Sequence, residues 1–77
     1  MEKAAQRVTA GSMYAHYKHP DQRYKVMGLV ILEATDEPGV IYQAQYGNNI
    51  SFVRPLASWL ETVLHNGKHV ARFTKVG

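Results

Sequence analysis

The most hydrophobic stretch of the chain, residues 24–33, does not alternate between apolar and polar positions. Its aliphatic side chains divide between the two faces of a strand, with Val26, Val30 and Leu32 on one face and Met27, Leu29 and Ile31 on the other. A strand that is apolar on both faces is either covered twice or long and bent. Gly28 lies where a bend or bulge is easiest. We therefore predict a long, bent second strand.

Shorter segments with the composition of strands surround this stretch and are separated by turn residues. The predicted short strands are residues 13–17, 40–46 and 50–54. Turns are predicted at residues 19–22, 36–39 and 47–49, where Pro, Asp, Gly and Asn concentrate. Alternation along the third strand places Tyr42 on the same face as Val40, Ala44 and Tyr46.

The last third of the chain combines a helix signal with a hairpin signal. Pro55 suits the start of a helix, and the apolar residues after it recur at helical spacing. Asn66-Gly67 is a strong hairpin signature that truncates this helix. We predict one short helical turn near residues 55–61, followed by a hairpin whose second strand runs to about Phe73 or beyond.

The chain of 77 residues has room for one domain. Short strands with turns every few residues are typical of a barrel or sandwich, and a chain this short can hardly fill two sheets. The predicted fold is mainly β: a small, SH3-like, partly open barrel of five to six strands. We expect residues 1–10 to be a flexible N-terminal tail and residues 11–77 to be the domain.

Composition narrows the class of protein. The chain has no cysteine, no apolar run of signal-peptide length and no stretch that could span a bilayer, so we expect a cytoplasmic protein without a membrane partner. The formal charge is +3 and the pI is about 9.4. Because the nine basic residues are spread along the chain, a soluble surface explains them better than a nucleic-acid footprint does.

A series of short motifs runs through most of the chain in a fixed order. They are residues 14–18 (YAHYK), 24–28 (YKVMG), 40–47 (VIYQAQYG), 53–56 (VRPL) and 67–73 (GKHVARF). Over about residues 12–75 this ordered set resembles the DUF1653 family of small bacterial domains. The resemblance implies a small β-barrel domain that has no assigned activity or cofactor.

Two departures from the family pattern stand out. The family has a His-Ser-Glu-Thr stretch after its second strand, where this chain has Leu32-Glu33-Ala34-Thr35. Only the threonine is kept, so a role for the family's histidine does not carry over. Where the family often has proline before Arg-Phe, this chain has Ala71.

The chemistry-bearing residues do not form a catalytic or metal-binding motif. In a two-residue Asn-Gly loop, His65 pairs with Lys68 and His69 with Leu64, so these two histidines are not opposite each other. No carboxylate supplies a convincing third metal ligand, and none of the serines has a nucleophile-elbow context. We expect no metal, no cofactor and no enzymatic activity.

The remaining candidates are aromatic and basic. Tyrosine combines apolar area with a polar tip, and arginine can hold a carboxylate or phosphate in a fork geometry. The predicted ligand-binding residues are Tyr14, His16, Tyr42, Tyr46, Arg54 and Arg72. Trp59 and Phe73 are expected in the core, whereas the sequence leaves open whether Tyr14, Tyr42 and Arg54 belong to a site or to the core.

Three functions follow in order of preference. The first is a non-catalytic binding module for a peptide, a partner protein or a small anionic ligand. The second is nucleic-acid binding, which would require a contiguous positive patch beside exposed aromatic residues. The third is a small enzyme or metal-binding domain. The two-faced apolar second strand also predicts a homodimer that covers its outer face.

Overall fold

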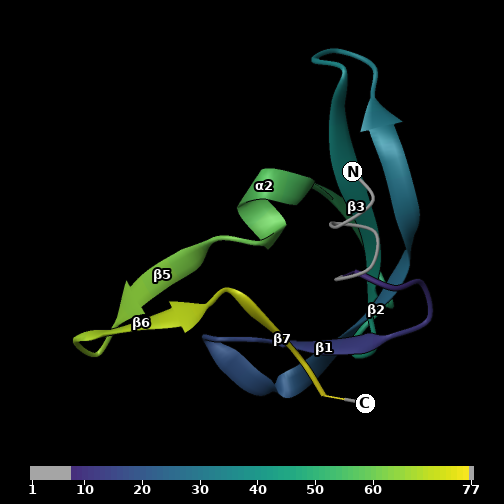
Figure 1. The fold of residues 1–77 in the computed structure, drawn as a ribbon. Coiled ribbons are helices and arrows are strands. Elements are labelled where there is room, and N and C mark those ends of the chain that lie inside the picture. The colour runs from purple at the N-terminus through teal and green to yellow at the C-terminus, as the bar shows by residue number, and fades with distance from the viewer. Residues whose placement is uncertain (1–7, 77) are drawn as a thin grey trace.

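The computed structural model describes residues 8–76, which form strands and one short helix (Figure 1). The elements are β1 (Met13–His16), β2 (His19–Leu32), β3 (Glu37–Ala44), β4 (Ser51–Pro55), α2 (Leu56–Trp59), β5 (Thr62–His65), β6 (Lys68–Ala71) and β7 (Phe73–Lys75). One sheet has the strand order β4-β3-β2-β1-β7, and β5 pairs with β6 in a separate ribbon. The mainly β fold with one short helix is confirmed. The sheet does not close into a barrel: among the described strands, β4 and β7 are its two edges.

Strand β2 is long enough to pair with a different neighbour along each half. Tyr24 lies opposite Tyr14 in β1, while Leu29 lies opposite Val40 in β3. The register shifts between Val26 and Gly28, so a bulge occurs where the glycine predicted it. The bulge also shifts the alternation of side chains between the two faces by one residue. Leu29 therefore packs against the core on the same side as Val26, and the predicted grouping of Val26 with Val30 and Leu32 is wrong.

Two predicted turns lie a few residues away from the observed ones. The first turn is at residues 17–18, not 19–22, and β2 already begins at His19. Pro20 is tolerated there because it has no partner across β1. The second turn is at residues 33–36, not 36–39, and Asp36 takes a left-handed conformation with φ 58°.

The Asn66-Gly67 hairpin is confirmed. Both residues have positive φ (53° and 78°), as a type I′ turn requires, and His65 pairs with Lys68 as predicted. The strand after the turn does not continue to Phe73, however. Strand β6 ends at Ala71, and the carbonyl of Arg72 accepts a hydrogen bond from the Tyr17 amide. The next strand, β7, then pairs with β1 and not with β5.

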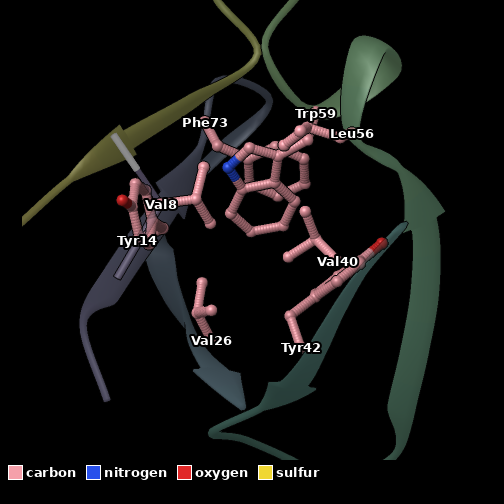
Figure 2. Packing of buried hydrophobic residues seen from close by; sticks show 8 residues of the cluster. All are labelled: Val8, Tyr14, Val26, Val40, Tyr42, Leu56, Trp59 and Phe73. Carbon is pink, nitrogen blue, oxygen red and sulfur yellow. The ribbon is translucent and has the colours of Figure 1, made fainter. Parts of the chain in front are cut away.

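The core lies between the sheet and α2 (Figure 2). We call the sheet face that carries Val26, Val40 and Tyr42 the inner face. The helix is shorter than predicted, four residues, yet it buries Leu56 and Trp59 against this face. The Trp59 ring stacks on Phe73 with centroids 3.8 Å apart and planes 7° apart. These rings fill the space between β4 and β7 that a closed barrel would cover with strands.

The core also includes Val8, which is 3% exposed although it lies within the segment expected to be a tail. Thr9 and Ala10, the last two residues of that segment, are exposed, and residues 1–7 lie outside the described residues. Among residues 8–76, no helix is long and apolar enough to cross a membrane.

Candidate anion-binding pocket

A pocket of about 360 Å³ opens on the inner face of the sheet, beside the Trp59–Phe73 stack. Residues distant in the sequence meet there because β1, β2, β3, β4 and β7 all contribute to this face. The lining residues are His16, Lys18, His19, Tyr24, Tyr42, Phe52, Arg54 and Phe73.

The strand register explains why these side chains converge. Tyr42 lies directly opposite Phe52, and residues opposite each other in an antiparallel pair share a face. Their rings stack with centroids 5.4 Å apart. Arg54 follows two positions later along β4 and therefore points to the same side.

Aromatic rings form the walls of the pocket. Phe73 is central, with ring centroids 6.0 Å from Tyr24, 5.6 Å from Tyr42 and 5.1 Å from His16. The hydroxyl of Tyr24 hydrogen bonds to that of Tyr46 at 2.6 Å. Burial and this hydrogen bond raise the pKa of Tyr24 to about 12, so its phenol stays neutral.

Arg54 supplies a positioned positive charge. Its Nη1 donates to Oγ of Ser58 at 3.0 Å, and its guanidinium carbon lies 5.6 Å from the Phe73 ring centroid. The Nε atom is buried and has no hydrogen-bond partner among residues 8–76. A buried donor without a partner costs free energy.

The pKa of His16 is affected by burial and by the positive charges around the pocket. Burial and then the nearby charges of Arg54, Arg72, His19 and Lys18 lower its pKa. The Lys18 amide donates to Nδ1 of the ring at 3.1 Å, which is the arrangement of a neutral imidazole. None of the described residues that line the pocket is acidic. The site is therefore positive and has no anion of its own.

The structure brings together half of the predicted site residues. His16, Tyr42 and Arg54 line the pocket, and Tyr46 stands at its edge through its bond to Tyr24. Tyr14 belongs to the core: it is 5% exposed and its ring packs edge-on against Trp59 at 5.3 Å.

Arg72 is also outside the pocket. Its Nε donates to the Ser58 carbonyl at 3.1 Å, and its Nη2 lies 3.5 Å from Oε1 of Glu61. The two arginines therefore converge on Ser58, but only Arg54 lines the pocket. Arg72 holds the end of α2 to the break before β7.

The remaining lining residues were not predicted. Phe52 could have been found from the pairing of β4 with Tyr42, and Tyr24 from its position two residues before buried Val26. Lys18 and His19 carried no such signal, because their place depends on the turn at residues 17–18 and on β7 reaching β1.

A second pocket, of about 370 Å³, lies between α2 and the start of β3. Its lining is Glu37, Pro38, Leu56, Ala57 and Leu60. It has a single charged group and no convergent hydrogen-bonding side chains. The described part of the chain also brings no group of three His, Cys, Asp or Glu residues together in a geometry that could hold a metal.

The fold and the pocket define a small mainly β domain with an open sheet and an aromatic, cationic site. The model of the family described as "Protein of unknown function (DUF1653)" matches residues 12–75, and the chain belongs to this family. A crystal structure of a DUF1653 protein from Bordetella bronchiseptica is similar, with a TM-score of 0.77 and 32% sequence identity. The match covers 92% of this chain and 91% of that one. No curated protein matches the chain.

The two departures from the family pattern lie outside the pocket. Leu32 ends β2, and residues 33–35 belong to the turn before β3, where the Thr35 hydroxyl accepts a hydrogen bond from the Glu37 amide at 3.4 Å. The threonine that is kept therefore helps to close a turn. Ala71 ends β6 just before the break at Arg72.

Proposed function

We propose that this domain is a non-catalytic binding module whose pocket holds an organic anion with a flat apolar group. One observation supports the proposal above the others: four aromatic rings and the Arg54 guanidinium line a pocket to which no described residue contributes an acidic group. Because Arg54 is already held by Ser58, little side-chain freedom is lost when it binds an anion.

The two parts of such a ligand have separate contacts. A carboxylate or phosphate would accept hydrogen bonds from Arg54 and interact with the charge of Lys18 at the rim. A flat apolar group would pack against Phe52, which is 41% exposed, and Tyr42. A carboxylate presented by a peptide or a partner protein would use the same contacts.

The absence of a catalytic role is part of the proposal. The described lining holds no serine, threonine, cysteine or carboxylate that could act as nucleophile or as partner to His16. The His16 ring accepts a hydrogen bond from the backbone amide of Lys18, which orients the ring but does not activate it as a base. The cytoplasmic location remains a prediction from the sequence.

Single-stranded nucleic acid is the second candidate ligand, favoured by the exposed ring of Phe52 beside Arg54 and Lys18. Three of the other basic residues do not extend this patch: Lys25 alternates to the opposite face of the sheet, Lys68 lies on the separate β5–β6 ribbon, and Arg72 is paired with Glu61. We therefore favour the small anion.

Calorimetry with matched probes tests the proposal. We expect phenyl phosphate and benzoate to bind, neutral benzamide not to bind, and inorganic phosphate to bind more weakly than phenyl phosphate. A peptide ending in phenylalanine, compared with its C-terminal amide, tests the peptide form of the ligand. Thermal shift provides a second readout, since a ligand at a hundredfold its dissociation constant adds about 2.7 kcal/mol of stability.

The variant Arg54→Gln should weaken phenyl phosphate binding about tenfold or more, because a charged hydrogen bond contributes roughly 1.5–3 kcal/mol. Arg23→Gln, an exposed arginine on the opposite face, is the matched control and should bind like the wild type. Equal binding by Arg54→Gln would contradict the proposal. A thymidine oligonucleotide that binds more tightly than phenyl phosphate, with a salt slope of about −2 for three cations, would favour the second candidate.

A further inference from the structure

The face of the sheet opposite the pocket, which we call the outer face, carries an aliphatic patch. Pairing and alternation place Val30, Leu32, Ile41 and Val53 there, around Gly39. A Cβ atom on Gly39 would meet Cδ2 of Leu32 at 3.0 Å and Cγ1 of Val53 at 3.2 Å, so these side chains converge. Val53 is 52% exposed.

No described helix or ribbon packs over this patch, whose aliphatic side chains other than Val53 are half-buried. Figure 1 shows α2 and the β5–β6 ribbon on one side of the β2–β3 hairpin, the side of the inner face. An antiparallel sheet can face water on one side, but that side is then normally polar. Here the middle of the outer face is aliphatic instead, with Val30 from β2, Ile41 from β3 and Val53 from β4.

The charges at the two ends of the outer face have opposite sign. Lys25 is level with Gln43 at one end, and Glu37 is level with Leu32 at the other. Both are exposed, and neither forms an ion pair among residues 8–76. The two charges are separated by roughly 20 Å along β3, given the rise per residue of a strand.

The aliphatic patch lies midway between these charges. The point halfway between Gln43 and Glu37 is level with Val40, and the neighbouring rows on the outer face hold Ile41 with Val53 and Gly39 with Val30. A face with an apolar centre and opposite charges at equal distances is complementary to itself after a twofold rotation.

We propose that the outer face is a homodimer interface in which two copies stack sheet on sheet. The twofold axis lies in the interface and perpendicular to the strands, which sets Lys25 of each copy against Glu37 of the other. An axis parallel to the strands would oppose like charges. Because only Val53 among the aliphatic residues of the patch is more than half exposed, association is expected in the micromolar range.

Sedimentation velocity across the micromolar range, up to the solubility limit, tests the proposal. The wild type should pass from monomer to dimer, and Val53→Lys should remain monomeric over the same range. Leu64→Lys, at a residue 68% exposed on β5, is the matched control and should dimerise like the wild type. Far-UV circular dichroism of each variant shows that it is folded.

Charge exchange tests the orientation of the two copies. Lys25→Glu and Glu37→Lys should each weaken association several-fold, and the double variant K25E/E37K should recover it. Wild type that stays monomeric at every concentration, or a dimer that persists in Val53→Lys, would overturn the proposal. Single charge variants that associate like the wild type would overturn the proposed twofold arrangement.

Discussion

The two faces of the sheet use the same strands for different kinds of surface. Along β4, Phe52 and Arg54 point to the inner face and Val53, between them, points to the outer face. The inner face is concave, aromatic and positive, whereas the outer face is aliphatic with opposite charges at its ends. The α2 helix packs on the inner face and leaves the outer face without a helix over it.

This difference shows how a small domain can hold a fixed site without a large core. Stacking on Trp59 fixes the Phe73 ring, and the Arg54 guanidinium lies over that ring. The pocket therefore depends on the same contacts as the fold. The outer patch is less buried than the inner face, since Val53 is 52% exposed and its neighbours Val30, Leu32 and Ile41 are half-buried. Perturbations of the inner face should therefore alter stability and binding together, and those of the outer face should leave the monomer intact.

The largest effect is expected from Trp59→Ala. Trp59 is 2% exposed and contacts Tyr14, Tyr42 and Phe73, so its removal should cost about 3–5 kcal/mol of unfolding free energy. On the outer face, Val53→Ala should cost less than about 1 kcal/mol, since half of that side chain is already exposed. Urea denaturation under conditions where the protein is monomeric measures both.

The control for this comparison is Trp59→Phe, which keeps a ring for stacking and should fall between the other two. If Val53→Ala destabilises the monomer as much as Trp59→Ala does, the outer face is as important for the stability of the monomer as the inner face, contrary to this comparison.

A smaller effect is expected from Tyr46→Phe, which removes the 2.6 Å hydrogen bond to Tyr24 at the edge of the pocket. The pKa of Tyr24, about 12, should fall toward the ordinary value of a tyrosine. Because the folded-state pKa is raised, the wild type should lose stability as pH rises from about 10 to 12, and the variant should lose less.

Alkaline titration of tyrosine absorbance, with urea denaturation at each pH, measures this shift. Tyr17→Phe, outside the Tyr24–Tyr46 bond, is the matched control. An unchanged Tyr24 titration in Tyr46→Phe would show that burial alone raises its pKa.

The smallest effect is expected from the pH dependence contributed by His16. Burial and the surrounding cations lower its pKa in the folded state. The unfolded chain therefore binds more protons at mildly acidic pH, and stability should fall as pH drops through about 6.5, the ordinary histidine value. His16→Gln should flatten this part of the profile.

Thermal denaturation between neutral and mildly acidic pH measures the difference, with His69→Gln on the β5–β6 ribbon as the matched variant. Addition of phenyl phosphate should raise the His16 pKa, because a bound anion offsets the nearby cations. The proposed pocket would be contradicted if the phosphate left the His16 titration unchanged while binding elsewhere.

Local patterns predicted much of the fold. The Asn66-Gly67 hairpin and its register, the bulge at Gly28 and the shared face of Val40, Tyr42 and Ala44 all follow from a few adjacent residues. Each depends on backbone freedom or strand alternation, which act within short segments.

The site was less predictable. Tyr14 and Tyr24 lie directly opposite each other on the same face, yet the first packs on Trp59 and only the second lines the pocket. Arg54 and Arg72 both donate to Ser58, yet Arg54 lines the pocket whereas Arg72 pairs with Glu61 outside it.

The sequence by itself determined that the chain forms short strands, where its hairpin turns and which of its alternating residues share a face. These features depend on backbone conformation and on the two-residue period of a strand. Tertiary structure decided which side of β2 faces the core beyond the bulge, and which aromatic and basic side chains meet at the pocket. Pairing of β7 with β1 and packing of α2 on the inner face join residues far apart in the chain, and no local pattern specifies such contacts.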